Sequence, residues 1–426
     1  MSQPLAEEAR QEPLEEVGSR RLLRMRVAGL GAIGFVLMLS YALARPAAEA
    51  LFLQAHGKEA LPYVWLLVAA ASALVVWVYS RWVTRFGLLT LFAAVALLSG
   101  LIFAALIVAT EAKLPGSRYA LYVWKDLYIV ALVEIFYSYS NSVFPIRLAR
   151  WAYGFFGVLG SVGGIAGNLA VGWIAQRYGS PAAIWLLTPL LSAVAAGAYL
   201  LGRHAGIGAP SAATGLRGSF REALSVVGAS AYLLQMVVLI GLVQTVITLI
   251  DFDFNALVSA AYPLLDAKTA IIGEVYAAIS MSTLLLHGAT GPTLRLVGVP
   301  LTLWAIPLLL GSMVLAYGLV PLFIVGAAMK VASKAFDYTL FRAAKEMLYI
   351  PLSYRERTQG KAIVDMLTYR IAKGGASILV LGLVQLHATP LVRWVTLGLC
   401  IGWFLLSVAI TRRFRQGISR QDEFTA

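Results

Sequence analysis

Residues 319–342 read LVPLFIVGAAMKVASKAFDYTLFR, and residues 361–386 read KAIVDMLTYRIAKGGASILVLGLVQL. Each segment is long enough to cross a bilayer, since a spanning helix needs about 20 predominantly apolar residues. Lys330 and Lys373 lie near the middles of the two segments. Lys334 and Arg370 lie within about one helical turn of them. Two membrane helices are therefore expected to carry cations at the depth of the bilayer core.

Four cations at that depth would be costly if they faced lipid. Insertion scales give about 2.5 to 3.5 kcal/mol for each cation, or about 10 to 14 kcal/mol for four. That is comparable with the whole net stability of a typical domain, about 5 to 15 kcal/mol. We therefore expect the four side chains to face a hydrated interior, where an anionic solute is the simplest ligand for them.

The composition excludes an ordinary soluble protein. Of the 426 residues, 60% are hydrophobic and 13% are charged, and the mean hydropathy is +0.80. The net charge of +13 does not indicate binding to nucleic acid, because the basic residues flank apolar segments instead of forming a soluble basic face. The lipid bilayer is thus an expected partner, and nucleic acid is not.

The apolar segments predict twelve transmembrane helices. They cover approximately residues 27–53, 61–80, 87–109, 119–143, 152–175, 181–202, 229–255, 270–289, 297–316, 319–342, 361–386 and 390–411. A polar stretch separates the sixth segment from the seventh. The predicted fold is therefore an all-α polytopic membrane protein with two six-helix bundles.

This pattern divides the chain into five parts. They are an N-terminal tail at 1–26, an N-terminal bundle at 27–202, a linker at 203–227, a C-terminal bundle at 228–416 and a C-terminal tail at 417–426. Lys and Arg gather at the segment ends on the side of both termini, so the positive-inside rule places the tails and the linker in the cytoplasm.

The two halves of the chain are weakly similar. The fourth segment runs to Phe144-Pro145-Ile146-Arg147, and the tenth is followed by Ile350-Pro351-Leu352. Proline ends a helix at both exits because it cannot donate the next backbone hydrogen bond. Two parallel six-helix repeats are typical of the major facilitator superfamily, in which the substrate binds near the midplane between the bundles.

The first segment carries polar residues on one helical face. Tyr41, Arg45 and Glu49 are spaced four residues apart, so their side chains share that face. Arg45 and Glu49 can form an ion pair across one turn. This pair is either a structural latch between helices or part of a gate or ligand site.

The seventh segment carries a similar stripe, made by Gln244, Thr248, Asp251 and Asn255. A polar stripe facing lipid would be costly, so it is expected to face an interior path.

Acidic residues are also expected within the membrane. Glu134 lies near the middle of the fourth segment, and we interpret it as a counter-ion to the lysines in preference to a proton carrier. Asp337 and Asp365 lie nearer the cytoplasmic ends of their segments. The midplane itself is therefore expected to be positively charged.

The sequence does not indicate an enzyme. The glycines from Gly154 to Gly167 are better explained by close helix packing than by nucleotide binding, because no Gly-Lys-Ser loop of the Walker type is present. Cys400 is the single cysteine, and the four histidines are scattered. We expect no catalytic triad, no metal site and no cofactor.

Residues 338–377 carry a more specific pattern. It consists of Tyr338-Thr339-Leu340-Phe341, Lys345-Glu346-Met347-Leu348-Tyr349-Ile350-Pro351-Leu352, Gly360-Lys361-Ala362, Asp365 and Lys373-Gly374-Gly375. This pattern resembles the ATP/ADP exchange transporters of plastids and obligate intracellular bacteria, a family with twelve helices similar to the major facilitator fold. Weaker resemblance covers Tyr41 to Pro62, Glu134, and Tyr153 to Asn168.

The resemblance implies exchange of a nucleoside triphosphate for a diphosphate, with basic residues binding phosphates and acidic residues serving gating or charge balance. The matching positions are Arg45, Glu134, Lys345, Glu346, Lys361, Asp365 and Lys373. The chain departs from the family pattern at Ala48, Trp65, Asn255 and Asp337, where basic residues are usual, and at Asp251, where glutamate is usual.

Together, the residues and the resemblance give two sets of candidate site residues. The expected substrate-binding residues are Tyr41, Arg45, Gln244, Lys330, Lys334, Arg370 and Lys373. The expected gating or charge-balance residues are Glu49, Glu134, Asp251, Asp337, Lys345, Glu346, Lys361 and Asp365.

The predicted function is an antiporter of nucleotides such as ATP and ADP, or of another phosphate-bearing organic anion, working by alternating access. A monomer in a bacterial inner membrane is expected. Two alternatives stay open at this point. One is a proton-coupled carrier of a different solute with Glu134 as its protonation site, and the other is a membrane sensor that does not transport.

Overall fold

The structure is a computed structural model that describes residues 4–82, 86–144, 146–205, 220–353, 356–361, 364 and 368–425. Almost all of these residues are helical. In this part of the chain, nine helices are long and apolar enough to cross a membrane. The protein is therefore an all-α, multi-pass membrane protein.

The N-terminal half contains seven helices. They are α1 (Pro4–His56), α2 (Leu61–Trp82), α3 (Leu88–Glu111), α4 (Ser117–Val143), α5 (Ile146–Tyr178), α6 (Ser180–Trp185) and α7 (Leu187–Ala205). The predicted sixth segment is thus divided between α6 and α7. Pro189 explains the break, because it has no N–H for the carbonyl of Trp185 and its ring crowds that carbonyl.

The C-terminal half begins with the short helix α8 (Phe220–Ala229). The helices that follow are α9 (Ala231–Ala261), α10 (Leu265–Leu296), α11 (Val299–Leu319), α12 (Phe323–Phe336), α13 (Arg342–Met347), α14 (Thr368–Gln385) and α15 (Val392–Thr425). A π-helical segment, Asp337–Phe341, joins α12 to α13. The predicted tenth span, 319–342, therefore starts four residues later, after Pro321, and runs on to Met347.

Three predicted spans are not among the nine apolar helices. They correspond to α4, α12 with α13, and α14. α12 is only 14 residues long before the π segment, and α4 and α14 carry charged residues within their length. These are the helices on which the sequence places most of the buried cations.

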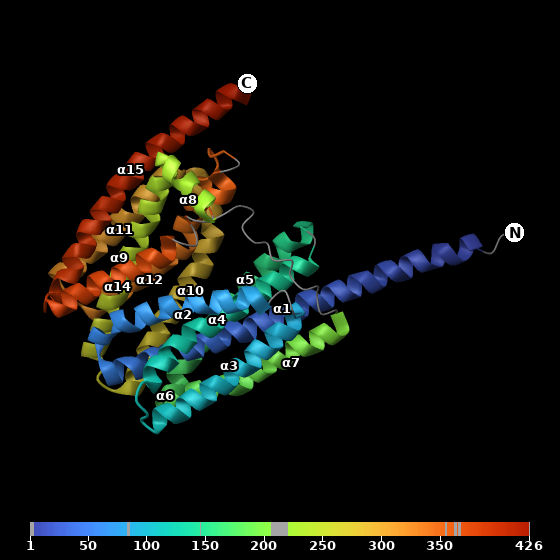
Figure 1. The fold of residues 1–426 in the computed structure, drawn as a ribbon, viewed down its shortest axis with the longest axis horizontal. Coiled ribbons are helices and arrows are strands. Elements are labelled where there is room, and N and C mark those ends of the chain that lie inside the picture. Colours follow the sequence, from blue (N-terminus) through green and yellow to red (C-terminus); the bar gives the residue numbers. More distant parts are fainter. Residues whose placement is uncertain are drawn as a thin grey trace.

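The two halves form two bundles that meet at one end. Figure 1 shows them converging near α6 and diverging towards the ends that carry the chain termini. Each bundle has its own apolar core, and a third cluster combines residues of both. Phe52 and Val64 of the first bundle and Phe254 and Ile272 of the second belong to this shared cluster. We call the end where the bundles meet the closed end.

Polar contacts between the bundles reinforce the closed end. The backbone N–H and the hydroxyl of Ser180 both donate to Asp266 Oδ1, at 2.7 and 2.6 Å. Lys268, which is buried, donates to Gln54 Oε1 at 2.8 Å. Lys268 lies in the first turn of α10 and Gln54 lies on α1, so this contact joins the two bundles.

Gly273 allows α10 to approach α5 closely at this end. A Cβ atom on Gly273 would lie 2.5 Å from Val171 Cγ1 and 2.6 Å from the carbonyl oxygen of Asn168. No atom of the surrounding structure lies within 4 Å of the equivalent position on Gly288, further along the same helix. Of these two glycines of α10, Gly273 is therefore the one required for contact between the bundles.

Gly273→Leu is expected to weaken the closed end. Overpacking costs about 1 to 3 kcal/mol, which corresponds to about a 5- to 150-fold loss in the ratio of closed to open molecules. Disulfide trapping between Gln54→Cys and Lys268→Cys, in a Cys400→Ala background, measures this population. Gly288→Leu is the matched control and should leave trapping unchanged. Equal trapping yields in both glycine variants would contradict this assignment of the closed end.

Candidate functional site

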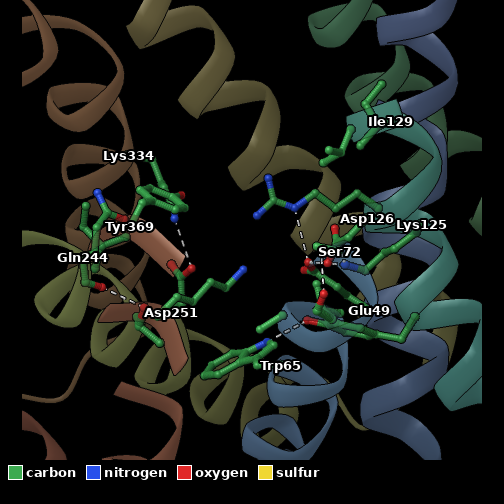
Figure 2. Close-up of a pocket in the computed structure, with 18 of the residues that line it drawn as sticks. Glu49, Trp65, Ser72, Lys125, Asp126, Ile129, Gln244, Asp251, Lys334 and Tyr369 are labelled. Carbon is green, nitrogen blue, oxygen red and sulfur yellow. Dashed lines mark hydrogen bonds and ion pairs between the residues drawn. The ribbon is translucent and has the colours of Figure 1, made fainter. Parts of the chain in front are cut away.

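A cavity of about 390 Å³ lies between the two bundles. Small-molecule sites typically measure about 300 to 1,000 Å³, so this cavity is large enough for a ligand. Figure 2 shows Glu49, Lys125 and Asp126 on one wall, with Asp251 and Lys334 on the opposite wall. The first wall belongs to α1 and α4, and the second to α9 and α12.

All seven expected substrate-binding residues line this central cavity. They are Tyr41, Arg45, Gln244, Lys330, Lys334, Arg370 and Lys373. Glu49 and Asp251, from the expected gating set, line it as well. Helices α1, α9, α12 and α14 bring these residues together because each helix turns its polar stripe inwards. The role of these residues in binding stays a prediction.

The cations on the N-terminal wall are paired. The guanidinium Nε of Arg45 lies 3.3 Å from Glu49 Oε1, as its spacing of four residues suggested. Lys125 Nζ lies 3.7 Å from the same Glu49 oxygen and 3.0 Å from Asp126 Oδ1. Lys125 is 1% exposed, so its charge depends on these two carboxylates for compensation.

Tyr276 of α10 connects this ion-pair group to the other bundle. Its hydroxyl donates to Glu49 Oε2 at 2.6 Å. The Arg45 guanidinium carbon lies 4.0 Å from the centre of the Tyr276 ring, within the range of a cation–π interaction. The pair of Arg45 and Glu49 is therefore both an intrahelical ion pair and a contact between bundles.

The C-terminal wall carries more cations than carboxylates. Lys330 and Lys334 both pair with Asp251, and the distance from Lys334 Nζ to Asp251 Oδ2 is 3.2 Å. Arg370 and Lys373 also line the cavity, and none of the ion pairs among the described residues includes either of them.

The lining residues thus divide the charge unequally between the two walls. The N-terminal wall contributes two cations and two carboxylates, while the C-terminal wall contributes four cations and one carboxylate. Because the described lining has an excess of positive charge, the cavity is suited to an anion.

A second cavity of about 340 Å³ adjoins the first and collects further predicted residues. Asp337, Lys345 and Glu346 line it. Gln244 lines both cavities, and its amide Nε2 lies 3.3 Å from Asp337 Oδ1. Lys361 pairs with Glu346. Asp365 lies outside the described residues.

Glu134 differs from our expectation. Its side chain is exposed on α4, and it does not line the central cavity. It lies one turn beyond Val130, a lining residue. The interpretation of Glu134 as a counter-ion to the cavity lysines is therefore wrong for this conformation, because none of the ion pairs among the described residues includes it.

Sequence reasoning missed several residues of the site. Lys125 and Asp126 of α4 line the cavity but are in neither set of expected site residues. Their charges within an apolar segment were the available signal. Tyr276 gave no such signal, because its spacing does not distinguish it from tyrosines that anchor helices at the membrane surface.

Comparison with known proteins identifies similar sequences. A family model described as TLC ATP/ADP transporter matches residues 305–414. ADP,ATP carrier protein 1 of Chlamydia pneumoniae is 23% identical over 344 residues, covering 69% of this chain and 67% of that protein. ADP,ATP carrier protein 3 of Rickettsia felis is 26% identical, covering 61% of this chain and 62% of that protein. The alignments therefore span about two thirds of these relatives.

Comparison of structures identifies the fold. A crystal structure of the nucleoside transporter NupG, in a mutant form, superposes with a TM-score of 0.70. The match covers 90% of this chain and 99% of that chain, at 11% sequence identity. The fold is therefore of the major facilitator type.

Proposed function

Since the chain belongs to the ATP/ADP transporter family, we propose that it exchanges nucleotides across a membrane by alternating access of its two bundles. The substrates would be ATP and ADP, or a closely similar phosphate-bearing organic anion. The chain would act as a transporter and not as an enzyme.

The observation that carries this proposal is the unequal charge of the central cavity. Six cations and three carboxylates line it among the described residues. A phosphate chain carries several negative charges and binds best to multiple charge-assisted donors. Arg370 and Lys373 are the cations best placed to bind it, because no described carboxylate forms an ion pair with either.

Lys330 and Lys334 would contribute to binding in a different way. Both pair with Asp251, so an incoming phosphate would compete with this carboxylate for their N–H donors. A bound polyanion would contact α12 and α14 on one wall and Arg45 of α1 on the other. Binding would therefore draw the two bundles towards each other around the substrate, as alternating access requires.

The location and orientation follow from the same proposal. Relatives occur in Chlamydia and Rickettsia, which supports placement in a bacterial inner membrane. The distribution of basic residues supports a cytoplasmic position for both termini. The bundles diverge towards the termini, so the cavity would open to the cytoplasm in this conformation (Figure 1). The chain would function as a monomer.

Proteoliposomes test the proposed exchange. Vesicles loaded with unlabelled ADP are expected to take up labelled ATP at least about tenfold faster than vesicles without internal nucleotide. The reason is that internal ADP lets the transporter return to its outward-open state with a nucleotide bound. Dissipation of the proton gradient should not change this rate. Glu134→Gln should also keep it, because Glu134 lies outside the cavity. Absence of saturable uptake for every nucleotide tested would refute the proposal.

A further inference from the structure

A lipid-facing groove lies between α10 and α12, separate from the central cavity. Its volume is about 680 Å³. Every residue that lines it is apolar except Glu274 and Ser282. Leu285 and Ile324, two of the lining residues, are 71% and 69% exposed. This is an apolar surface that the chain itself leaves uncovered.

The direction of Glu274 on α10 is fixed by its neighbours. Tyr276 lines the central cavity, and Gly273 packs against α5. Residues two apart on a helix point about 200° apart, so Glu274 points away from the cavity that Tyr276 faces. It shares its face with Ala278 and Leu285, four and eleven residues further along, and both line the groove. Glu274 is therefore directed towards the surrounding membrane.

Glu274 also lies well within its helix and not at the helix end. It is nine residues from Leu265, the first residue of α10, which corresponds to about 13 Å along the helix axis. Its side chain is exposed, and none of the hydrogen bonds or ion pairs among the described residues includes it. A carboxylate in this position is unfavourable unless a cation accompanies it.

We propose that the groove binds a phospholipid with a primary ammonium headgroup, that is, phosphatidylethanolamine. The ammonium group donates to the Glu274 carboxylate, and an acyl chain packs along the apolar lining formed by α10 and α12. A primary ammonium offers three N–H donors, whereas the quaternary ammonium of phosphatidylcholine offers none. This difference in N–H donors selects the headgroup, and burial of the lipid's acyl chain against the apolar lining contributes affinity.

Lipid retention tests this proposal without any transport assay. The protein is reconstituted into nanodiscs with equal amounts of phosphatidylethanolamine and phosphatidylcholine and extracted with mild detergent, and the lipids that remain are counted by native mass spectrometry. The intact protein should retain phosphatidylethanolamine in preference, by about tenfold, as expected for one additional charge-assisted hydrogen bond. Phosphatidylethanolamine with one or two N-methyl groups should show an intermediate preference, because each methyl group removes one N–H donor.

Two variants separate the headgroup contact from the groove. Glu274→Gln should remove the preference, while Glu59→Gln, an exposed glutamate in the turn before α2, should keep it. Leu285→Trp should fill the groove and reduce retention of both lipids, while Leu301→Trp, at an exposed position on α11, should not.

Three results would overturn the proposal. The first is equal retention of the two lipids by the intact protein, which requires no variant. The second is an unchanged preference in Glu274→Gln. The third is crosslinking of Glu274 to a second copy of this chain in the bilayer, because the face would then be an interface between protomers.

Discussion

Lys373→Ala is expected to reduce nucleotide uptake by about ten- to a hundredfold, the loss that follows when one hydrogen bond to a charged group is removed. Lys373 lines the central cavity on α14 and forms no ion pair with a described residue. Its replacement by alanine should therefore weaken substrate binding without leaving a carboxylate that has lost its ion-pair partner. Initial rates of labelled ATP uptake, measured over a range of concentrations, test this expectation.

Two control variants accompany Lys373→Ala, one that keeps the positive charge and one that removes a positive charge far from the cavity. Lys373→Arg keeps the charge and should retain a substantial part of the uptake. Arg295→Ala removes an exposed cation near the end of α10, away from the cavity, and should have no effect. The thermal midpoint of unfolding should be similar in all three variants. If uptake by Lys373→Ala equals that of the unmodified protein, the cation-lined cavity is not the phosphate site.

Asp251→Asn is expected to have the largest effect on stability, about 3 kcal/mol or more, as found when a buried ion pair loses one partner. Asp251 is the carboxylate that pairs with both Lys330 and Lys334, whose exposed fractions are 1% and 8%. Its loss leaves two buried cations about one turn apart without compensation. A lower midpoint of unfolding in detergent would show this effect.

A double variant gives the matched control for Asp251→Asn. Lys330→Met removes one of the two uncompensated charges and keeps the length of the side chain. The combination of Asp251→Asn with Lys330→Met should therefore recover part of the lost stability, because contacting residues are not additive. A double variant less stable than Asp251→Asn alone would show that the lysines do not depend on Asp251.

The sequence was sufficient to predict part of the cavity lining, namely the helices that carry Lys330, Lys334, Arg370 and Lys373. A cation in a membrane segment must face an interior, and this single constraint directs Lys330, Lys334, Arg370 and Lys373 to one place. Spacing of four residues added Arg45 and its neighbours to the same prediction. The structure places these side chains around the central cavity, as the constraint requires. The fold class followed from the length and number of apolar segments.

The depth of the cavity could not be predicted in this way. Position along a helix gives a height in the membrane, but the width of the cleft at that height depends on how far the bundles diverge. Lys125 lines the central cavity, whereas Glu134, nine residues further along α4, does not. The π-helical segment at Asp337–Phe341 also has no signature in the apolar pattern.

The imbalance between the two cavity walls bears on why such a carrier would trade solutes one for one. The α1 and α4 wall is neutral overall, whereas the α9, α12 and α14 wall has three more cations than carboxylates among the described lining residues. A protein without substrate would have to enclose these three excess positive charges away from water while it changes from one open state to the other. Mutual repulsion of the cations makes this step slow. A polyanionic cargo cancels the surplus, so only an occupied carrier resets quickly. Strict coupling would then arise from electrostatics, with no need for a driving ion.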